Sequence, residues 1–398
     1  MKLFPPLAVV SMLLASALLS AQSPVPAPSG ADDAQTLARG WAALAGGKAA
    51  ESERIADGLL KQSARHHDAV TLKIRSRLTT RNAAGVTAAL DAYETWLAHV
   101  GQREDVFLLE PVAMSIVDTL ALSQDRAVRT RALEIKAALG DTSAIAQLRT
   151  TAEEPGSGAL RQDTTLARLL DQAAIDRLTK RVTEPGGRDV SAAIDALRDA
   201  KVTSAVPAIA GALDPRRPMP TKMAAARALG QLGGVEAIPR LKQALNDPDP
   251  PVRIIAAVSL AALGDPSGDE IVRSIENSPV GDYRLLVVEA RAASDPAGAW
   301  VGVASSVLQD PDPLVRLRAA ELLLTHAANP GSAFDVLRQA LTDSNPAMRQ
   351  AAADRLDHIP VTALDRDLPT LRKLFRDPSP LAQLESAAAI LRIAGALR

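Results

Sequence analysis

The 398-residue chain contains no cysteine. This absence excludes disulfide scaffolds, thiolate zinc sites, iron–sulfur clusters and cysteine nucleophiles. Aromatic residues are scarce, since the chain has only three Trp, two Tyr and four Phe. Single-stranded nucleic acid stacks on aromatic side chains, so this scarcity disfavours that partner. With 45 Lys and Arg against 46 Asp and Glu, the net charge of -1 supplies no global field for nucleic acid or an anionic membrane.

The first 21 residues have the pattern of a secretory signal peptide. Lys2 precedes an apolar stretch over residues 7–19, and Ser20 and Ala21 follow it as a small-residue cleavage site. The stretch is shorter than the roughly 20 residues of a membrane-spanning helix, which argues against the alternative of a retained anchor. Cleavage of residues 1–21 predicts an exported, periplasmic protein without an integral membrane span. Residues 22–33 then form a Pro- and Ser-rich tether.

Beyond the tether, the hydrophobic pattern is helical throughout. Apolar residues recur at i, i+3, i+4 and i+7, and no segment shows the alternation typical of strands. From residue 123 onward, an acidic turn followed by a helix start recurs every 29 to 34 residues, most clearly at 247–253, 310–316, 343–349 and 377–383. The sequence therefore predicts an all-α array of stacked helix pairs, in which each pair contacts mainly its neighbours.

Each acidic turn is suited to ending one helix and starting the next. The residue before the helix is an N-cap type at four turns, namely Asp249, Asp312, Asn345 and Ser379. A proline follows each of them and suits the first helical position. Gly233 and Gly264 are placed to cap the C-terminal ends of helices. Arginines early in these helices, such as Arg253, are expected to pair with the aspartates of neighbouring repeats. Calcium loops are the alternative for the acidic turns, and too few ligands are present to favour it.

The second helix of each pair carries a shared string. Residues 144–148, 174–178 and 237–241 each place Ala, Ile and Leu at the same spacing, which gives one buried helical face. This pattern resembles the HEAT repeat family, in its short, bilin-lyase-like variety, over residues 123–398. The resemblance implies a right-handed α-solenoid of stacked antiparallel helix pairs, a HEAT-like superhelix, with its second helices lining the concave side.

Residues 34–122 repeat less regularly. The first part of this segment is similar to a tetratricopeptide repeat in residues that include Trp41, Leu44, Gly46, Ala56 and Leu59. The remainder is either a second degenerate copy or the first ill-marked HEAT pairs. We expect this TPR-like helical segment to cap the N-terminal end of the array, because a terminal apolar face must be covered.

The five histidines do not form a recognisable catalytic or metal site. Only His66 and His67 are neighbours, and adjacent positions on a helix do not face one ligand. Deoxyhypusine hydroxylase, a HEAT-type enzyme, uses paired His-Glu motifs for iron, whereas no histidine here is followed by Glu. Bilin lyases act on cytoplasmic antenna proteins, which is the wrong compartment for an exported chain. We therefore predict no catalytic residue, cofactor or metal.

The concave side implied by the resemblance is the predicted binding surface. The sixteen positions that follow the buried Leu or its equivalent in the second helices hold seven cations and no anion, and the uncharged ones include Ala210 and Gly211. The predicted partner-binding residues are Arg149, Lys180, Lys242, Gln243, Arg273, Arg338, Gln339, Arg372 and Lys373. A basic inner groove would select acidic segments, and the bland alternative is a solvated helix face. Trp41, Tyr93 and Trp96 are a second place for partner anchors.

These observations predict an exported, non-catalytic scaffold that binds a protein or peptide on its concave face. The alternative is an enzyme or maturation factor of the bilin-lyase-like or deoxyhypusine-hydroxylase-like HEAT class. A third interpretation is a subunit that supplies only rigidity to an envelope or electron-transfer assembly. No nucleic acid is expected as a partner.

Overall fold

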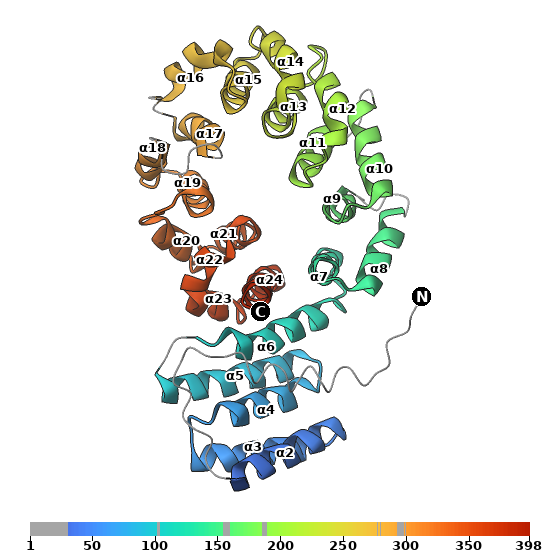
Figure 1. The fold of residues 1–398 in the computed structure, drawn as a ribbon, viewed down its shortest axis with the longest axis vertical. Coiled ribbons are helices and arrows are strands. Elements are labelled where there is room, and N and C mark those ends of the chain that lie inside the picture. Colours follow the sequence, from blue (N-terminus) through green and yellow to red (C-terminus); the bar gives the residue numbers. More distant parts are fainter. Residues whose placement is uncertain are drawn as a thin grey trace. The chain divides into compact units, whose positions relative to one another are not determined.

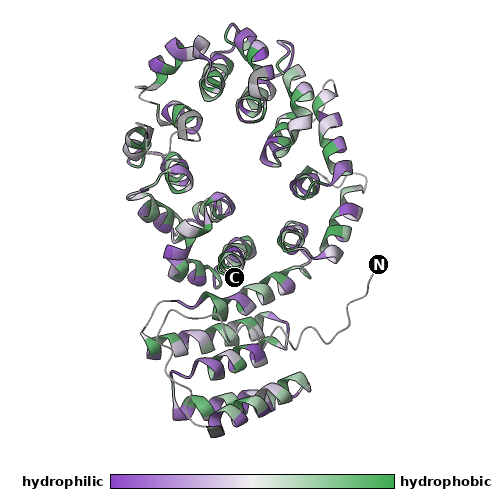
Figure 2. Ribbon diagram, in the orientation of Figure 1, coloured by the Kyte–Doolittle hydropathy of each residue, from purple (hydrophilic) through white to green (hydrophobic). Residues whose placement is uncertain are grey.

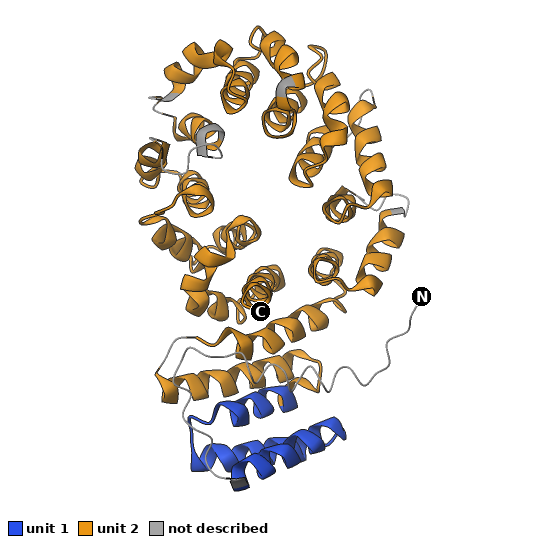
Figure 3. Cartoon of the chain, in the orientation of Figure 1, with its two compact units in different colours: residues 1–76 blue, residues 77–398 orange. Residues whose placement is uncertain are grey.

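The computed structural model describes residues 31–398 except 102–103, 154–159, 185–188, 277, 279, 293–297 and 299. The predicted signal peptide and residues 22–30 of the predicted tether lie outside this part of the chain. The described residues form helices and no strand, which confirms the all-α prediction. Within the same residues, no helix has both the length and the hydrophobicity to cross a bilayer. The chain divides into two compact units, residues 1–76 and 77–398 (Figure 3).

The first unit contains α2 (Ala31–Ala45), α3 (Ala49–Gln62) and most of α4 (His67–Leu78). Leu59 and Leu72 are buried in its core, while Trp41 remains 38% exposed. The glycine that allows close packing is Gly40, because a Cβ there would lie 2.4 Å from a Leu72 methyl group. At the predicted Gly46, an added Cβ would meet no side chain. The segment predicted as TPR-like, residues 34–122, spans both units, and its repeat type stays a prediction.

The second unit begins with α5 (Ala83–Val100) and α6 (Val106–Leu120) and continues as two layers of helices (Figure 1). The inner layer consists of α7 (Arg126–Ala138), α9 (Leu160–Arg168), α11 (Val190–Asp199), α13 (Met219–Leu232), α15 (Pro250–Ala262), α17 (Gly281–Ala292), α19 (Pro313–His326), α21 (Pro346–Ala353) and α24 (Pro380–Ala396). The outer layer consists of α8 (Thr142–Glu153), α10 (Gln172–Thr183), α12 (Val206–Gly211), α14 (Ile238–Ala244), α16 (Asp269–Glu276), α18 (Trp300–Val307), α20 (Ala333–Leu341) and α23 (Leu368–Leu374). Short helices η5 (Leu356–His358), α22 (Val361–Leu364) and η6 (Asp365–Asp367) connect α21 to α23.

The packing follows the predicted repeat. Inner helices contact the next inner helix along the chain, as α11 does α13 and α13 does α15, and each also packs on its outer partner. Most helices show hydrophilic and hydrophobic turns side by side in Figure 2, as amphipathic helices do. Their apolar sides bury a continuous core between the two layers, which includes Leu197, Ile209, Leu229, Leu241 and Leu260. The α-solenoid prediction is therefore confirmed.

Most of the predicted junction chemistry is present. The Asp312 carboxylate accepts from the backbone N–H of Leu314 at 2.8 Å, and Asn345 caps α21 through Ala347 at 3.0 Å. Ser379 caps α24 in the same way. Gly264 has the left-handed conformation, with φ 75°, that its C-terminal position requires. At the other predicted glycine cap, the positive φ falls on Gly234 rather than on Gly233.

Two junction predictions are wrong. Asp249 makes no cap hydrogen bond, because its carboxylate accepts from the Lys222 ammonium at 2.9 Å. The junction arginines mainly bind backbone carbonyls of their own turn, as Arg253 does by donating to the carbonyl of Asp247 at 2.7 Å. Arg349 does this and also pairs with Asp377 of the next repeat at 2.6 Å. These carbonyls lie only six residues before the arginine in the chain, whereas the aspartates of neighbouring repeats lie further away along it.

The repeat array closes on itself. Helix α24, at the end of the chain, packs along α6, and this is one of the most extensive helix contacts in the second unit. Leu109 and Val112 of α6 are fully buried, as are Leu384 and Ala387 of α24. The two ends of the array thus cover each other's apolar faces, which was not expected from a solenoid with free ends. We call this α6–α24 contact and its flanking ion pairs the seam.

Candidate partner-binding site

The predicted binding residues lie on the outer layer. Helices α8, α10, α14, α16, α20 and α23, which carry them, form the convex side of the closed array in Figure 1. The expectation that Arg149, Lys180, Lys242, Gln243, Arg273, Arg338, Gln339, Arg372 and Lys373 line a concave face is therefore wrong. The first helix of each pair instead forms the inner layer, where it packs on neighbouring inner helices, as α13 does on α11 and α15. Whether any of the nine residues binds a partner stays a prediction.

Several of these cations are neutralised by the next repeat. Arg149 pairs with Asp171 at 2.7 Å, Lys242 with Asp265 at 2.8 Å, and Arg338 with Asp367 at 3.1 Å. Each of these aspartates directly precedes the next outer element, where Asp171 and Asp265 also accept backbone N–H groups. Hydrogen bonds from Lys242 and Ser267 lower the pKa of Asp265 to about 2. The predicted basic stripe is thus largely a ladder of ion pairs between repeats.

Arg372 shows how the ladder ends. It occupies in α23 the position that Arg338 occupies in α20, but no further outer helix follows it. Its partners come from the other end of the array, where it binds Glu94 and donates to Glu104 at 3.0 Å. Glu104 directly precedes Asp105, the residue that caps α6. Closure therefore repeats the ion pair that joins neighbouring repeats elsewhere.

Further ion pairs cross the seam. Arg376 binds Asp91 at 2.6 Å and Glu94 at 2.9 Å, and Arg398 binds Glu110 at 2.6 Å. Tyr93, which is buried, donates its hydroxyl to Glu104 at 2.6 Å, and burial followed by this hydrogen bond raises its pKa. Trp96 is only 7% exposed, so the expectation that Tyr93 and Trp96 offer partner anchors is wrong.

The inner wall, the solvent-facing side of the inner layer, carries ion pairs of its own. Arg168 of α9 reaches Asp199 of α11 at 3.6 Å, and Arg198 pairs with Asp195 at 2.5 Å. On later helices, Arg318 binds Glu289. Glu321 then forms an ion pair with Arg355, whose Nε lies 3.2 Å away, and a hydrogen bond of 2.8 Å with His358. The pKa of His358 is raised, first by the hydrogen bond to Glu321, and the charges of Asp199 and Asp357 contribute.

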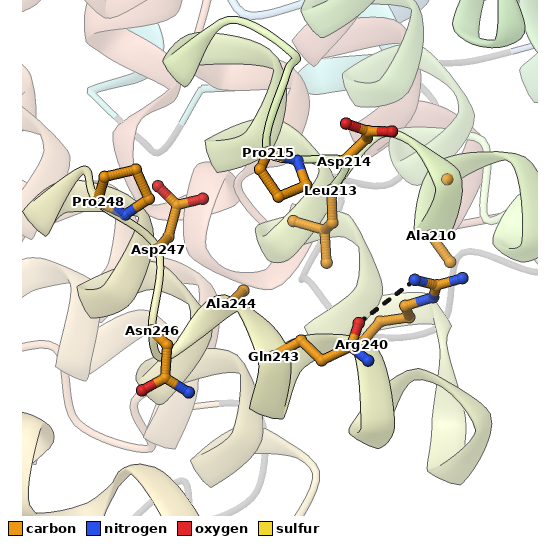
Figure 4. A pocket seen from close by; sticks show the side chains of 11 residues that line it. Ala210, Leu213, Asp214, Pro215, Arg240, Gln243, Ala244, Asn246, Asp247 and Pro248 are labelled. Atoms are coloured by element: carbon orange, nitrogen blue, oxygen red, sulfur yellow. Dashed lines mark hydrogen bonds between the residues drawn. The ribbon is translucent and has the colours of Figure 1, made fainter.

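A shallow pocket opens on the outer layer between α12 and α14 (Figure 4). At the two stripe positions of α12 stand Ala210 and Gly211 in place of long side chains, and both line the pocket. Leu213 and Ala244 are its buried apolar lining, and Arg240 and Gln243 stand beside it, joined by a hydrogen bond of 3.3 Å (Figure 4). The only sequence signal for this pocket is the Ala210-Gly211 pair.

Among the described residues, no three His, Asp or Glu side chains are grouped as a metal site would require. His67 contacts Asp68 at 3.5 Å, and His66 accepts from the N–H of Ala69, so this pair takes part in local helix-start contacts. His358 belongs to the inner-wall pairs described above.

Comparison with known proteins gives the repeat type. The family described as HEAT repeats matches residues 175–261, 206–291 and 303–391. No curated protein matches the sequence. Two of the solved structures that resemble the chain are the complex of CpcE and CpcF of phycocyanin lyase from a Nostoc species and human deoxyhypusine hydroxylase with glycerol. The first is 20% identical with a TM-score of 0.39, covering 60% of this chain and 94% of that one. The second is 20% identical with a TM-score of 0.29, covering 57% and 98%. Likenesses this distant carry no argument about activity.

Proposed function

We propose, from the premise that this chain belongs to the HEAT-repeat family, that it is an exported, non-catalytic scaffold that binds a protein or peptide partner. The lysine, apolar run and small residues within residues 1–21 support export to the periplasm. Stacked repeats form extended surfaces on rigid helices, which suits them to hold a partner. Ion pairs between repeats and across the seam fix these surfaces before a partner arrives, so binding orders few groups.

The pocket between α12 and α14 is the observation that best supports partner binding. It combines an apolar lining from Leu213 and Ala244 with the polar side chains of Arg240, Gln243 and Asn246. A concave site with apolar walls and a few polar groups is suited to a protruding side chain of a partner. Asp214 and Asp247 at its edge are already held by Arg216 and Lys222, so the polar groups left for a partner are mainly donors.

Filling the pocket tests this role. A Cβ at Gly211 would meet no heavy atom within 4 Å, so Gly211→Trp should occupy the pocket without moving the backbone. Gly302, on outer helix α18, has the same open surroundings, and Gly302→Trp is the matched control. We expect the wild type and the control to recover a partner from the cell envelope, and Gly211→Trp to recover none. Equal recovery with all three proteins would contradict a role for the pocket.

Export has a separate test. We expect the mature protein to be found in the periplasmic fraction and to begin at Gln22, as mass spectrometry of the terminal peptide would show. Retention of residues 1–21 on protein in the cytoplasm would contradict export without bearing on partner binding.

A further inference from the structure

Among the residues that the structure describes, the ion pairs of the inner wall are interrupted between α11 and α17. They connect α9 with α11, and they resume from α17 through α19 to η5. Between these stretches lie α13 and α15. On α15, Pro251, Ile254, Ala261 and the nearly buried Val258 form one face without a charged group. Arg253, which is also partly exposed, lies on another side of the helix and binds carbonyls of its own turn. These positions are three to four residues apart and lie on one side of the helix.

Arg227 stands beside this apolar face. It is partly exposed on α13, one turn from the partly buried Met223. Because α13 packs on α12 and α14 toward the outside and between α11 and α15 at its flanks, its remaining face is the inner wall. The Nε of Arg227 is buried and lacks a hydrogen-bond partner, and the guanidinium makes no ion pair within the described chain. Its charge does act on Asp195. Burial raises the pKa of Asp195, and the charges of Arg198 and Arg227 oppose this shift.

We propose that this strip, formed by Met223, Arg227, Ile254, Val258 and Ala261, binds an extended segment of a partner polypeptide that carries a carboxylate beside apolar side chains. A half-desolvated guanidinium with unused donors favours a planar carboxylate, which it can bind through two hydrogen bonds. The neighbouring α15 face offers apolar contact and no competing charge. The strip is separate from the outer pocket, so this inference goes beyond the proposed function and does not depend on it.

Defined peptides test the proposal. The probe is a short fluorescein-labelled peptide that alternates leucine and aspartate, and its binding to the full chain is measured by fluorescence anisotropy. Matched peptides carry asparagine or lysine in place of aspartate. We expect the acidic peptide to bind at least about tenfold more tightly than the asparagine peptide, as one charge-assisted pair would give. The preference should shrink with added salt because the pair is partly solvent-accessible.

Variants locate the site. Arg227→Gln and Arg227→Glu should remove the preference for the acidic peptide, and Arg227→Gln keeps the side chain polar in case charge reversal disturbs Asp195. Lys61→Glu changes the charge by the same amount as Arg227→Glu on α3, at an exposed position that belongs to neither proposed surface, so it should bind like the wild type. The absence of acidic-peptide binding, or equal binding by wild type and Arg227→Gln, would overturn the proposal. A single-stranded oligonucleotide serves as a further probe. If the wild type binds it and Arg227→Gln weakens that binding as much as it weakens binding of the acidic peptide, the strip is a general anion site and the proposal is overturned.

Discussion

Arg131 of α7 and Glu385 of α24 lie 254 positions apart and are joined by two hydrogen bonds, of 2.7 Å from Nε and 2.5 Å from Nη2. Arg131 also binds Asp357 and reaches Glu134 at 3.3 Å, so one buried guanidinium serves three carboxylates. Burial raises the pKa of Glu385, and the hydrogen bonds from Arg131 oppose this shift. This cluster links the start of the array directly to its end.

Removal of Arg131 should therefore be costly. Arg131→Met leaves Glu385 and Glu134 buried without their common partner, although Arg161 still holds Glu134. Breaking a buried pair by removing one member typically costs about 3–5 kcal/mol. We expect a loss of this size in the free energy of unfolding, measured by urea denaturation.

The outer layer offers a control for this change. Arg149→Met removes an ion pair with Asp171 on the surface, where Arg149 is 57% exposed. Exposed pairs contribute about 0–1 kcal/mol. Similar losses for the two variants would show that the Arg131 cluster is no stronger than a surface pair.

The junction aspartates should separate into two classes. Asp312→Ala removes an N-cap and should cost about 0.5–2 kcal/mol in any background. Asp249→Ala instead removes a partner of the buried Lys222, so its cost should fall in a Lys222→Met background. Double-mutant cycles by thermal or urea unfolding measure the difference. A cost of Asp249→Ala that is independent of Lys222 would contradict the assignment.

His358 should make stability depend on pH near neutrality. Its pKa is raised in the folded protein, mainly by Glu321, so protonated His358 stabilises the fold. This contribution is complete below the unfolded value of roughly 6.5 and is lost as pH rises through the folded pKa. His358→Gln should therefore lower the free energy of unfolding at pH 5.5, by less than about 1 kcal/mol because the side chain is half-exposed. At pH 8.5 the same substitution should have little effect. Burial lowers the pKa of His326, so protonation of this side chain at low pH opposes folding. Replacing His326 should therefore raise the free energy of unfolding at pH 5.5 and have little effect at pH 8.5.

The features found from sequence were those set by neighbouring residues. Asp312 and Asn345 cap helices that begin at the next residue, so spacing alone predicted them. The seam was not predictable in this way, because nothing near Arg131 in the chain indicates Glu385. The face on which Arg149 and Lys242 lie was also missed, since helical periodicity distinguishes buried from exposed sides but not inner from outer layers. The lack of an ion pair at Arg227 was not predictable either, because it depends on which charged side chains the neighbouring helices bring near it.

The pKa of Asp265 tests the ladder of ion pairs between the outer helices. Lys242→Met should raise the pKa of Asp265 from about 2 toward the ordinary value of roughly 3.9, which carboxyl NMR titration would measure. Arg273→Met, on the following outer helix, should leave that pKa unchanged. An Asp265 pKa near 3.9 already in the wild type would contradict the ladder. Since the pKa is depressed, the stabilising contribution is present above about 3.9 and is lost as pH falls toward 2.

Closure of the repeat array is the central claim, and a cross-linking experiment tests it most directly. The chain has no cysteine, so Asp91→Cys and Arg376→Cys would supply its only thiols, at positions whose native side chains are 2.6 Å apart. A closed array predicts rapid cross-linking within one chain by a short bis-maleimide, seen as a mobility shift of the denatured monomer. The pair Asp91→Cys and Lys242→Cys, in which only the second position lies on a repeat distant from the seam, should not react. Failure of the seam pair to cross-link in the folded monomer, or equal reaction of both pairs, would contradict a closed array.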